Sequence, residues 1–403
     1  MPLLRNIAEL ATCPARGSQQ DAGLIRNAAL VYHQGRIEWA GPQQELPSRF
    51  QDMEIIDCDR KLVIPGLVDC HTHLCFGGWR GDEFEQRLAG ASYQEIAASG
   101  GGIISTVSAT RAASTGHLER KARAVLDGML KLGVTTVECK SGYGLDEGNE
   151  LKQLDVYRRL DESHAVDLVP TFLGAHIMPP EHRKHRDRYI DLLCETLIPK
   201  VSKLGLARFC DVFVEKGAYT PDEARRIFAA AREHRLGIKV HADQLSDGGG
   251  ASLAAEFNAV SAEHLEYVSD DGIGALAESG TVAVSLPLAS LYLGEPYLPA
   301  RRLLEAGVPV AVATDFNPGS APSYHLPLAM TLACLNQSMT PQESLMGATT
   351  VAAKAIDLRD TIGSLHPGYQ ADLAVIDAPS LNQWLYHFTP NACLRVLKNG
   401  KWQ

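Results

Sequence analysis

Short apolar segments alternate with longer amphipathic stretches over residues 66–355. Eight segments predict β-strands, in the order GLVDCHTHL, GVTTVECKSG, DLVPTFLGAH, FCDVFVEKG, GIKVHADQ, AVSAEHL, TVAVSLPLA and VPVAVATDFN. Helical periodicity fills most of the gaps. One such stretch, TPDEARRIFAAAREHRLG, begins with a Thr N-cap, a Pro at the first helical position and acidic residues in the first turn. Repeated strand–helix units form parallel sheets, so eight of them predict an α/β fold of the (β/α)8 TIM-type barrel.

Both ends of the chain have a different pattern, in which short alternating runs are broken by turn residues. AALVYHQGRIEWAG and MEIIDCDRKLVIPG each predict two strands with the alternation typical of hairpins. After residue 355, ADLAVIDA and ACLRVLKNGKW predict further short strands, with Gly368 and Gly400 at turns. We therefore predict a small composite β-sandwich domain made of residues 1–65 and 356–403, beside a barrel domain of residues 66–355.

Composition and charge exclude several classes of protein. The 403 residues are 45% hydrophobic and carry 38 basic and 48 acidic side chains, a formal net charge of −10. Such a chain is not disordered, and its acidic balance argues against nucleic acid or an anionic membrane as partner. The start MPLLRNIAEL lacks signal-peptide features, and no apolar run is long enough to span a membrane. We expect a cytoplasmic protein whose nine scattered cysteines are free thiols.

The strongest local signal for chemistry is His71-Thr72-His73 at the end of the first predicted barrel strand. Residues two apart on a strand face the same side, so the two imidazoles form a natural pair of metal ligands. A His-x-His pair is common, however, and two ordinary histidines would also explain it. The metal hypothesis gains weight because His241, His264 and Asp315 end the fifth, sixth and eighth predicted strands. In a barrel these strand ends converge, and the residues would surround one metal ion.

A metal ion with an open coordination position lowers the pKa of a bound water toward neutrality. Asp315 could then take the proton of that water and pass it to a departing nitrogen. His264 could be a ligand, or could lie just outside the ligand shell and hold a carbonyl oxygen. The spacing leaves both roles open. Taken singly, His241 or His264 could be a core histidine bonded to a carbonyl, and Asp315 could form an Asx turn.

Longer segments of the chain resemble known families. PGLVDCHTHL, the later His and Asp residues, and GSLHPGYQADLAVID resemble the amidohydrolase superfamily. A narrower set of segments resembles the imidazolonepropionase family: CFGGWRGDEFEQRLAGASYQEIAASGGGIISTVSATR, ECKSGYGL, FLGAHIMPPE, KVHADQLSDGGG and ATDFNPGSAP. This resemblance implies hydrolysis of the lactam C–N bond of 4-imidazolone-5-propanoate to N-formimidoyl-L-glutamate, the third step of histidine degradation. It also implies a homodimer, and one divalent or trivalent ion per subunit, zinc or iron.

The resemblance also implies roles for individual residues. Its metal ligands are His71, His73, His241 and Asp315. Its substrate and product contacts are Arg80, Tyr143, His176, Gln244, Asn317, Gly319 and Ser320. His264 assists the carbonyl oxygen. Gln244 stands where some members have glutamate, and because an amide can only hydrogen-bond, proton transfer would depend on Asp315 and His264. Ser320 is often threonine in the family, and the hydroxyl is retained.

Some alternatives stay open at this point. Arg80 offers a bidentate fork for a propionate carboxylate, but a surface arginine paired with Asp82 or Glu83 would fit the local sequence as well. Lys140 and Lys216 are candidates for the carboxylated lysine that bridges two metals in some amidohydrolases, yet neither is convincing, and we predict a single metal. The alternative functions are a nucleobase deaminase, which would release ammonia, and an inactive relative that acts as a binding protein.

Overall fold

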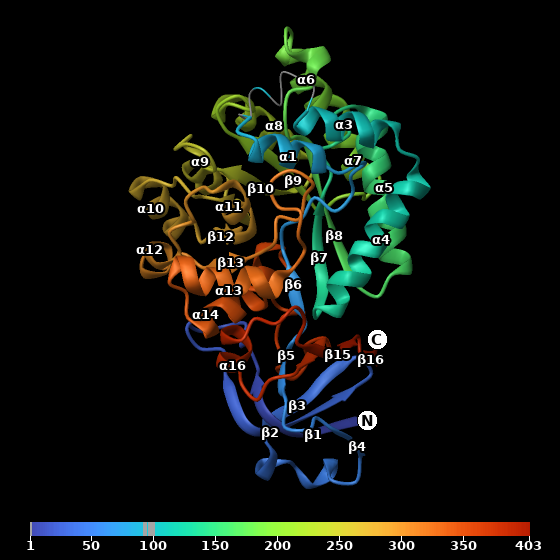
Figure 1. Cartoon of the computed structure of the whole chain (residues 1–403), viewed down its shortest axis with the longest axis vertical. Helices are drawn as coiled ribbons and strands as arrows, with labels where there is room; N and C mark the ends of the chain where they lie inside the picture. The colour runs from blue at the N-terminus through green and yellow to red at the C-terminus, as the bar shows by residue number, and fades with distance from the viewer. Residues whose placement is uncertain (1, 92–94, 96–100) are drawn as a thin grey trace.

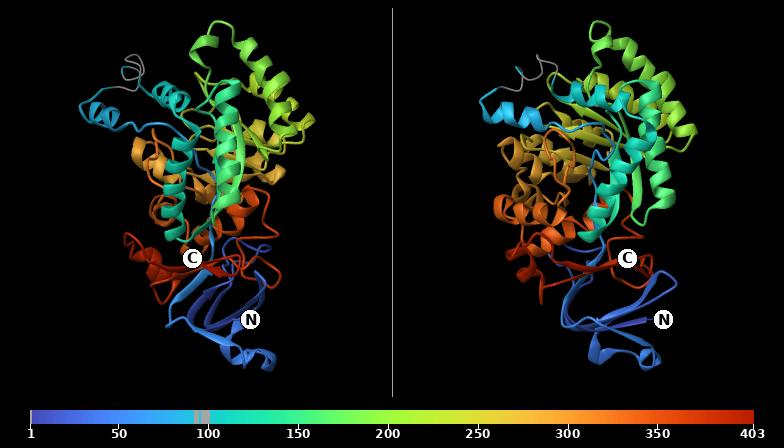
Figure 2. Two further views of the ribbon diagram at one scale, coloured as in Figure 1. Left: turned by 90° about the vertical axis from the view of Figure 1, so that its right-hand side faces the viewer. Right: turned by 45° about the vertical axis from the view of Figure 1, so that its right-hand side comes forward.

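The computed structural model describes residues 2–91, 95 and 101–403. Two sheets organise the chain, one above the other in Figure 1. Both views of Figure 2 show the blue and red segments from the two chain ends lying together below the barrel. The resemblance segment over residues 75–111 includes positions 92–94 and 96–100, which lie outside the described residues.

The upper sheet contains eight parallel strands that follow one another in chain order. They are β6 (Leu67–Asp69), β7 (Val134–Lys140), β8 (Asp167–Ala175), β9 (Phe209–Val214), β10 (Gly237–Ala242), β11 (Ser261–His264), β12 (Val282–Ser285) and β13 (Val310–Val312). All eight predicted strands are confirmed. The first and last strands meet beyond their ends, where the backbone N–H of His73 donates to the carbonyl of Phe316 at 2.8 Å. A parallel bridge between Thr72 and Phe316 completes this closure.

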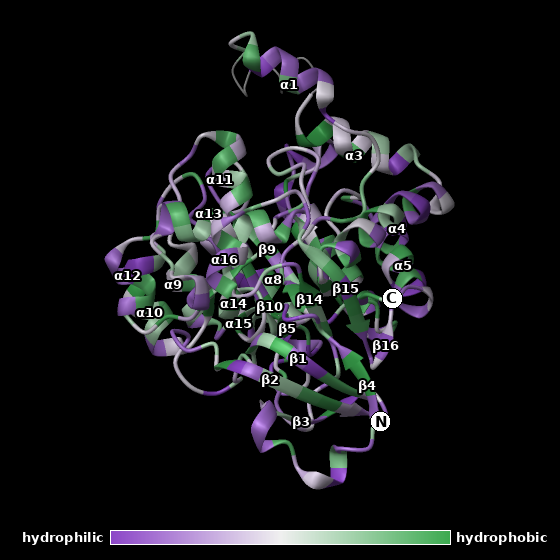
Figure 3. Cartoon of the chain, turned by 60° about the horizontal axis from the view of Figure 1, so that its bottom comes forward, coloured by the Kyte–Doolittle hydropathy of each residue, from purple (hydrophilic) through white to green (hydrophobic). Residues whose placement is uncertain are grey.

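Amphipathic helices surround the barrel, and Figure 3 shows hydrophobic and hydrophilic residues along the same helices. The α-helices described in this part of the chain are α1 (Gly81–Leu88), α3 (Ile103–Ala112), α4 (Thr115–Lys131), α5 (Glu147–Ser163), α6 (Arg186–Asp191), α7 (Ile198–Lys203), α8 (Pro221–Glu233), α9 (Gly250–Glu256), α10 (Asp270–Ser279), α11 (Pro287–Leu293), α12 (Ala300–Glu305), α13 (Leu326–Gln337), α14 (Pro341–Gly347) and α15 (Thr350–Ala355). The predicted start of α8 is confirmed: Thr220 is the N-cap, Pro221 is the first helical residue, and Thr220 and Glu223 form a capping box.

The lower sheet combines both ends of the chain, as predicted. Its strands are β1 (Pro2–Ala11), β2 (Leu24–His33), β3 (Arg36–Pro42), β4 (Glu54–Asp57), β5 (Leu62–Pro65), β14 (Leu373–Ile376), β15 (Cys393–Lys398) and β16 (Lys401–Trp402). β14 pairs antiparallel with β5, which brings the C-terminal strands beside the N-terminal ones. Apolar side chains of β1, β2, β5, β14 and β15 share one buried cluster. Helix α16 (Leu381–Tyr386) lies between β14 and β15 in the chain.

One of the two hairpins expected near the N-terminus forms and the other does not. β2 and β3 pair antiparallel around Gln34 and Gly35, whose φ values of 47° and 76° suit a tight hairpin turn. β4 and β5 form as strands, but both pair in parallel with β1. The hairpin prediction for this second pair is wrong because the ten-residue β1 takes β4 along its first half and β5 along its second.

The connection from the lower sheet to the barrel places the first site residues. Only Gly66 separates β5 from β6, so the chain runs directly from one sheet into the other. A Cβ atom at Gly66 would lie 2.3 Å from the hydroxyl of Thr135, which explains why the position holds glycine. Among the helices in the described residues, none is long and apolar enough to cross a membrane.

Candidate active site

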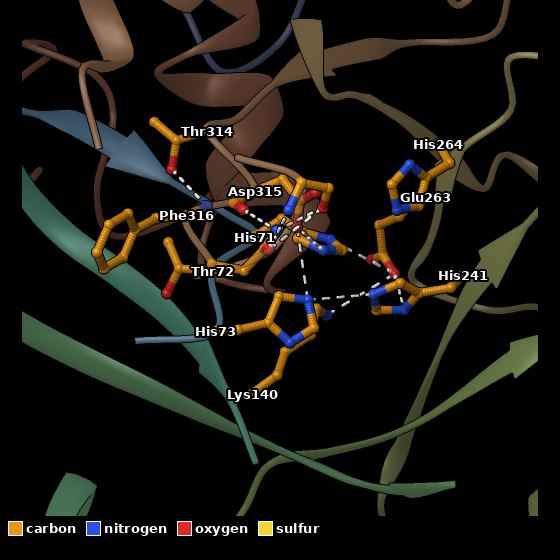
Figure 4. A network of polar contacts seen from close by, with 12 residues as sticks. His71, Thr72, His73, Lys140, His241, Glu263, His264, Thr314, Asp315 and Phe316 are labelled. Carbon is orange, nitrogen blue, oxygen red and sulfur yellow. Dashed lines mark hydrogen bonds and ion pairs between the residues drawn. The ribbon is translucent and has the colours of Figure 1, made fainter. Parts of the chain in front are cut away.

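Four side chains from distant parts of the sequence meet at the carboxyl ends of the barrel strands (Figure 4). His71 and His73 follow β6, His241 lies in β10, and Asp315 follows β13. The Nε2 atoms of His71 and His73 lie 3.4 and 3.5 Å from Oδ1 of Asp315. Nε2 of His241 lies 3.4 Å from Nε2 of His73. One small space therefore receives three imidazole nitrogens and a carboxylate oxygen.

The protonation states of these groups suit a metal ion. Burial, reinforced by the charge of Lys140, lowers the pKa of His71 and His241 well below the ordinary histidine value. Burial alone would raise the pKa of Asp315, but a hydrogen bond from His73 and the charge of His264 outweigh it and lower that pKa. Within the described residues, both ring nitrogens of His71 are buried without a hydrogen-bond partner. The neutral imidazoles of His71 and His241 beside the ionised carboxylate of Asp315 are typical donors for a divalent cation.

His264 lies at the edge of this group. It ends β11 with φ of +76°, and Asp315 has φ of +55°, so both residues hold left-handed backbone that is rare for non-glycine residues. The imidazole of His264 faces Glu266, with 3.4 Å between Nδ1 and Oε1. Burial lowers the pKa of His264, but the Glu266 carboxylate more than offsets this, and the pKa is raised overall. Ring nitrogens of His264, His241 and His71 also lie within 4.8 Å of one another, so His264 borders the metal-ligand group.

A cavity of about 500 Å³ opens in front of the four side chains. Its lining includes every residue that the resemblance assigned to substrate or product: Arg80, Tyr143, His176, Gln244, Asn317, Gly319 and Ser320. His73, His241, His264 and Asp315 line the same cavity. The fold thus brings the predicted substrate contacts and the predicted metal ligands to one space.

Arg80 does not form the surface ion pair that its local sequence allowed. Its Nε donates to the hydroxyl of Thr106 in α3 at 2.8 Å. Glu83 instead accepts hydrogen bonds from Gly102 N and the Ser105 hydroxyl, at 2.9 and 3.0 Å. No ion pair joins Arg80 to a carboxylate anywhere in residues 2–91, 95 or 101–403. The guanidinium is consequently directed to the cavity rather than to the neighbouring acids.

The loops around Tyr143 and Asn317 are shaped by buried acceptors. Glu150 of α5 accepts from the backbone N–H groups of Gly144 and Leu145, both at 2.8 Å. Asn317 accepts from the N–H groups of Gly319 and Ser320, also at 2.8 Å. The Asx turn considered for Asp315 is therefore made by Asn317.

His176 and Gln244 both line the cavity. The His176 ring stacks on His73, with centroids 5.1 Å apart, and its Nδ1 lies 3.1 Å from the carbonyl of Gly142. Gln244 sits in the loop after β10. The carboxylate of Glu215 anchors this loop by accepting from Leu245 N at 2.9 Å and from the Ser246 hydroxyl.

A group of buried charged residues beneath the four ligand candidates was not predicted. We call it the ion cluster: Glu138, Lys140, Asp211, Lys239 and Glu263, each with an exposed fraction of 0%. Lys140, considered above as a metal bridge, donates instead to Glu138 and Asp211, at 2.8 Å each. Lys216 lines a separate surface hollow. A weak signal existed in the sequence, because these charges interrupt otherwise apolar strands at positions that face the barrel interior.

Comparison with known proteins agrees with this geometry. The model of the amidohydrolase family matches residues 62–403. The imidazolonepropionase of Geobacillus thermodenitrificans (strain NG80-2) is 49% identical over 96% of this chain and 92% of its own length. The imidazolonepropionase of Symbiobacterium thermophilum is 47% identical over 98% of this chain and 94% of its own length. The chain belongs to the imidazolonepropionase family.

Solved structures extend the comparison to the fold of this imidazolonepropionase-family chain. Guanine deaminase of E. coli matches with a TM-score of 0.74 over 100% of this chain and 98% of its own, at 14% identity. A zinc-bound adenosine deaminase from Xanthomonas campestris matches with a TM-score of 0.73, covering 100% and 92%, at 19% identity. At these identities the likeness concerns the fold alone, which the imidazolonepropionase family shares with deaminases.

Proposed function

We propose that this chain hydrolyses the lactam C–N bond of 4-imidazolone-5-propanoate and releases N-formimidoyl-L-glutamate, in the degradation of histidine. The observation that carries the proposal is a cavity lined by Arg80 together with His73, His241 and Asp315, with Nε2 of His71 3.4 Å from Oδ1 of Asp315. A guanidinium suits the propionate carboxylate, and the metal-ligand group suits hydrolysis of an amide. The near-full-length similarity to imidazolonepropionases supports the same substrate.

The metal would be one divalent ion, zinc or ferrous iron, held by His71, His73, His241 and Asp315. The ion cluster beneath these ligands holds three carboxylates and two ammonium groups, so acidic side chains outnumber basic ones around the proposed cation. When bound, such an ion makes water a stronger nucleophile and polarises a carbonyl.

The protein's own groups would bind, orient and move protons. Asp315 accepts a proton from the attacking water and delivers it to the ring nitrogen as the C–N bond breaks. His264, whose pKa is raised, donates a hydrogen bond to the lactam oxygen. Arg80 anchors the propionate. The neutral amide of Gln244 cannot accept a proton from water, so Gln244 would orient the ring by hydrogen bonds. The other cavity residues, Tyr143, His176, Asn317, Gly319 and Ser320, would contribute to the same orientation.

Loss of the imidazolone ultraviolet absorbance tests the proposal directly. Metal-loaded protein should remove the absorbance of synthetic 4-imidazolone-5-propanoate. The reaction should release no ammonia. Persistence of the signal with metal-loaded protein would refute the substrate assignment. A parallel ammonia assay with guanine, cytosine and adenosine separates the proposed activity from deamination, which attacks an amidine carbon instead of a lactam carbonyl.

A further inference from the structure

We propose that Asp211 and Glu263 of the ion cluster are positioning residues that set the metal affinity of the site. They would fix the rings of His241 and His71 so that Nε2 of each faces the metal position. The inference rests on the proposed function only in requiring that His71, His73, His241 and Asp315 hold a metal ion.

Asp211 makes the more direct contact of the two. Its Oδ2 lies 3.0 Å from Nδ1 of His241, and its Oδ1 accepts from the backbone N–H of the same residue at 3.2 Å. Nδ1 of His241 has no partner with hydrogen-bond geometry among the described residues, but a carboxylate oxygen at 3.0 Å favours the neutral tautomer with its proton on Nδ1. That tautomer leaves the lone pair of Nε2 for a metal. Asp211 lies in β9 and His241 in β10, which are neighbouring strands of the barrel.

Glu263 acts at a longer distance on both rings. Its Oε2 lies 3.8 Å from Nδ1 of His71 and 3.8 Å from Nδ1 of His241. Within the described part of the chain, this buried oxygen has no hydrogen-bond partner. A distance of 3.8 Å is beyond hydrogen-bond length, so this buried carboxylate oxygen acts on the two imidazoles electrostatically.

The two ammonium groups of the ion cluster hold these carboxylates in place. Lys140 lies 2.8 Å from Asp211 Oδ2 and 3.7 Å from Glu263 Oε2. Lys239 lies 2.9 Å from Glu263 Oε1. Without such partners, buried carboxylates would be costly to ionise. Because Lys140 is positive itself, its removal would both free Asp211 and lessen repulsion of the metal, so the carboxylate substitutions give the clearer test.

Carboxylates behind metal-bound histidines typically contribute about 10–100-fold in metal affinity. Asp211→Asn, which removes the shorter contact, should weaken zinc binding by about 100-fold, and Glu263→Gln should weaken it by about 10-fold. The dissociation constant is measured on metal-free protein by competition with a chelator of known affinity. With Co(II) in place of zinc, the ligand-field absorption of Asp211→Asn should also shift, because the His241 ring is no longer held.

The chain offers a matched control in the lower sheet. Asp372 is buried and pairs with the buried ammonium of Lys398 at 2.7 Å, far along the chain from the ligand candidates. Asp372→Asn removes a comparable buried ion pair, so it should lower the stability while leaving zinc affinity and the Co(II) spectrum unchanged.

Wild-type zinc affinity and an unchanged Co(II) spectrum in Asp211→Asn would overturn the proposal, as would an equal loss of affinity in Asp372→Asn. If Asp211→Asn does not fold, Glu263→Gln decides: wild-type affinity in that variant would refute the role of the cluster. These measurements use no substrate. A failure of imidazolone turnover with tight zinc binding would therefore refute the proposed function and leave this inference standing.

Discussion

Gly319→Ala tests the position of Arg80 with the addition of one methyl group. The new Cβ would lie 2.3 Å from Nη1 and 2.9 Å from Cζ of Arg80. Two nonbonded heavy atoms reach van der Waals contact at about 3.5 Å, so the guanidinium must move by about 1 Å. Because the clashing atoms are the end of a flexible side chain, the cost to folding is small. The expected effect falls on substrate binding instead.

A displaced guanidinium loses charge-assisted hydrogen bonds to the propionate, which are worth about 1.5–3 kcal/mol. KM for 4-imidazolone-5-propanoate should therefore rise by about 10–100-fold, while kcat and zinc content stay near wild type. Arg80→Ala should raise KM at least as much, and Gly319→Ala should add little in that background. Gly274→Ala, on an exposed face of α10 with nothing within 4 Å of the new Cβ, is the control. An unchanged KM in Gly319→Ala would show that Arg80 does not anchor the substrate from its observed position.

Three further substitutions test other parts of the structure. Asp315→Asn should lower kcat by about 10²–10⁴ because it removes the proton acceptor; a variant that keeps wild-type kcat with full metal content would exclude that role. Glu150→Ala leaves buried N–H groups of the Tyr143 loop without an acceptor, at about 1–3 kcal/mol each, so the thermal midpoint should fall and KM should rise, whereas normal values of both would count against the loop's part in binding. Burial lowers the pKa of Lys121 to about 8 from its ordinary 10.5, so between these pH values the unfolded chain holds more protons and stability rises with pH. In Lys121→Met, the free energy of unfolding measured with urea should lack this part of its increase with pH. An equal pH dependence of that free energy in the variant and the wild type would contradict the burial of this ammonium group.

Much of the barrel was predictable because its signals are local. Each of the eight strands is a short apolar segment with turn or helix signals on both sides, and a parallel barrel joins neighbours in chain order, so no long-range choice of partner was needed. The lower sheet required such a choice. Nothing in the sequence of β4 or β5 indicates that both pair with β1, because pairing is decided by which edges the folded chain leaves free.

In the candidate site, too, some residues could be predicted from local sequence and others could not. His71, His73, His241 and Asp315 stand at predicted strand ends, and the resemblance supplied the substrate contacts that line the cavity. The homodimer, the domain boundaries and the cytoplasmic location remain predictions. The ion cluster escaped prediction because a lone charge in an apolar strand has no visible partner until neighbouring strands bring one beside it.

The sequence by itself determined the types and order of the strands and helices, and it supplied the candidate residues for binding a metal or a carboxylate. The tertiary structure decided which of them interact. Asp211 contacts His241, and Arg80 lies against Gly319, because parallel strands and the closure of the barrel bring together residues 30 and more positions apart. The reason is physical: periodicity reflects the burial of each residue, whereas ligand geometry and buried charge balance depend on distances that exist only in the folded chain.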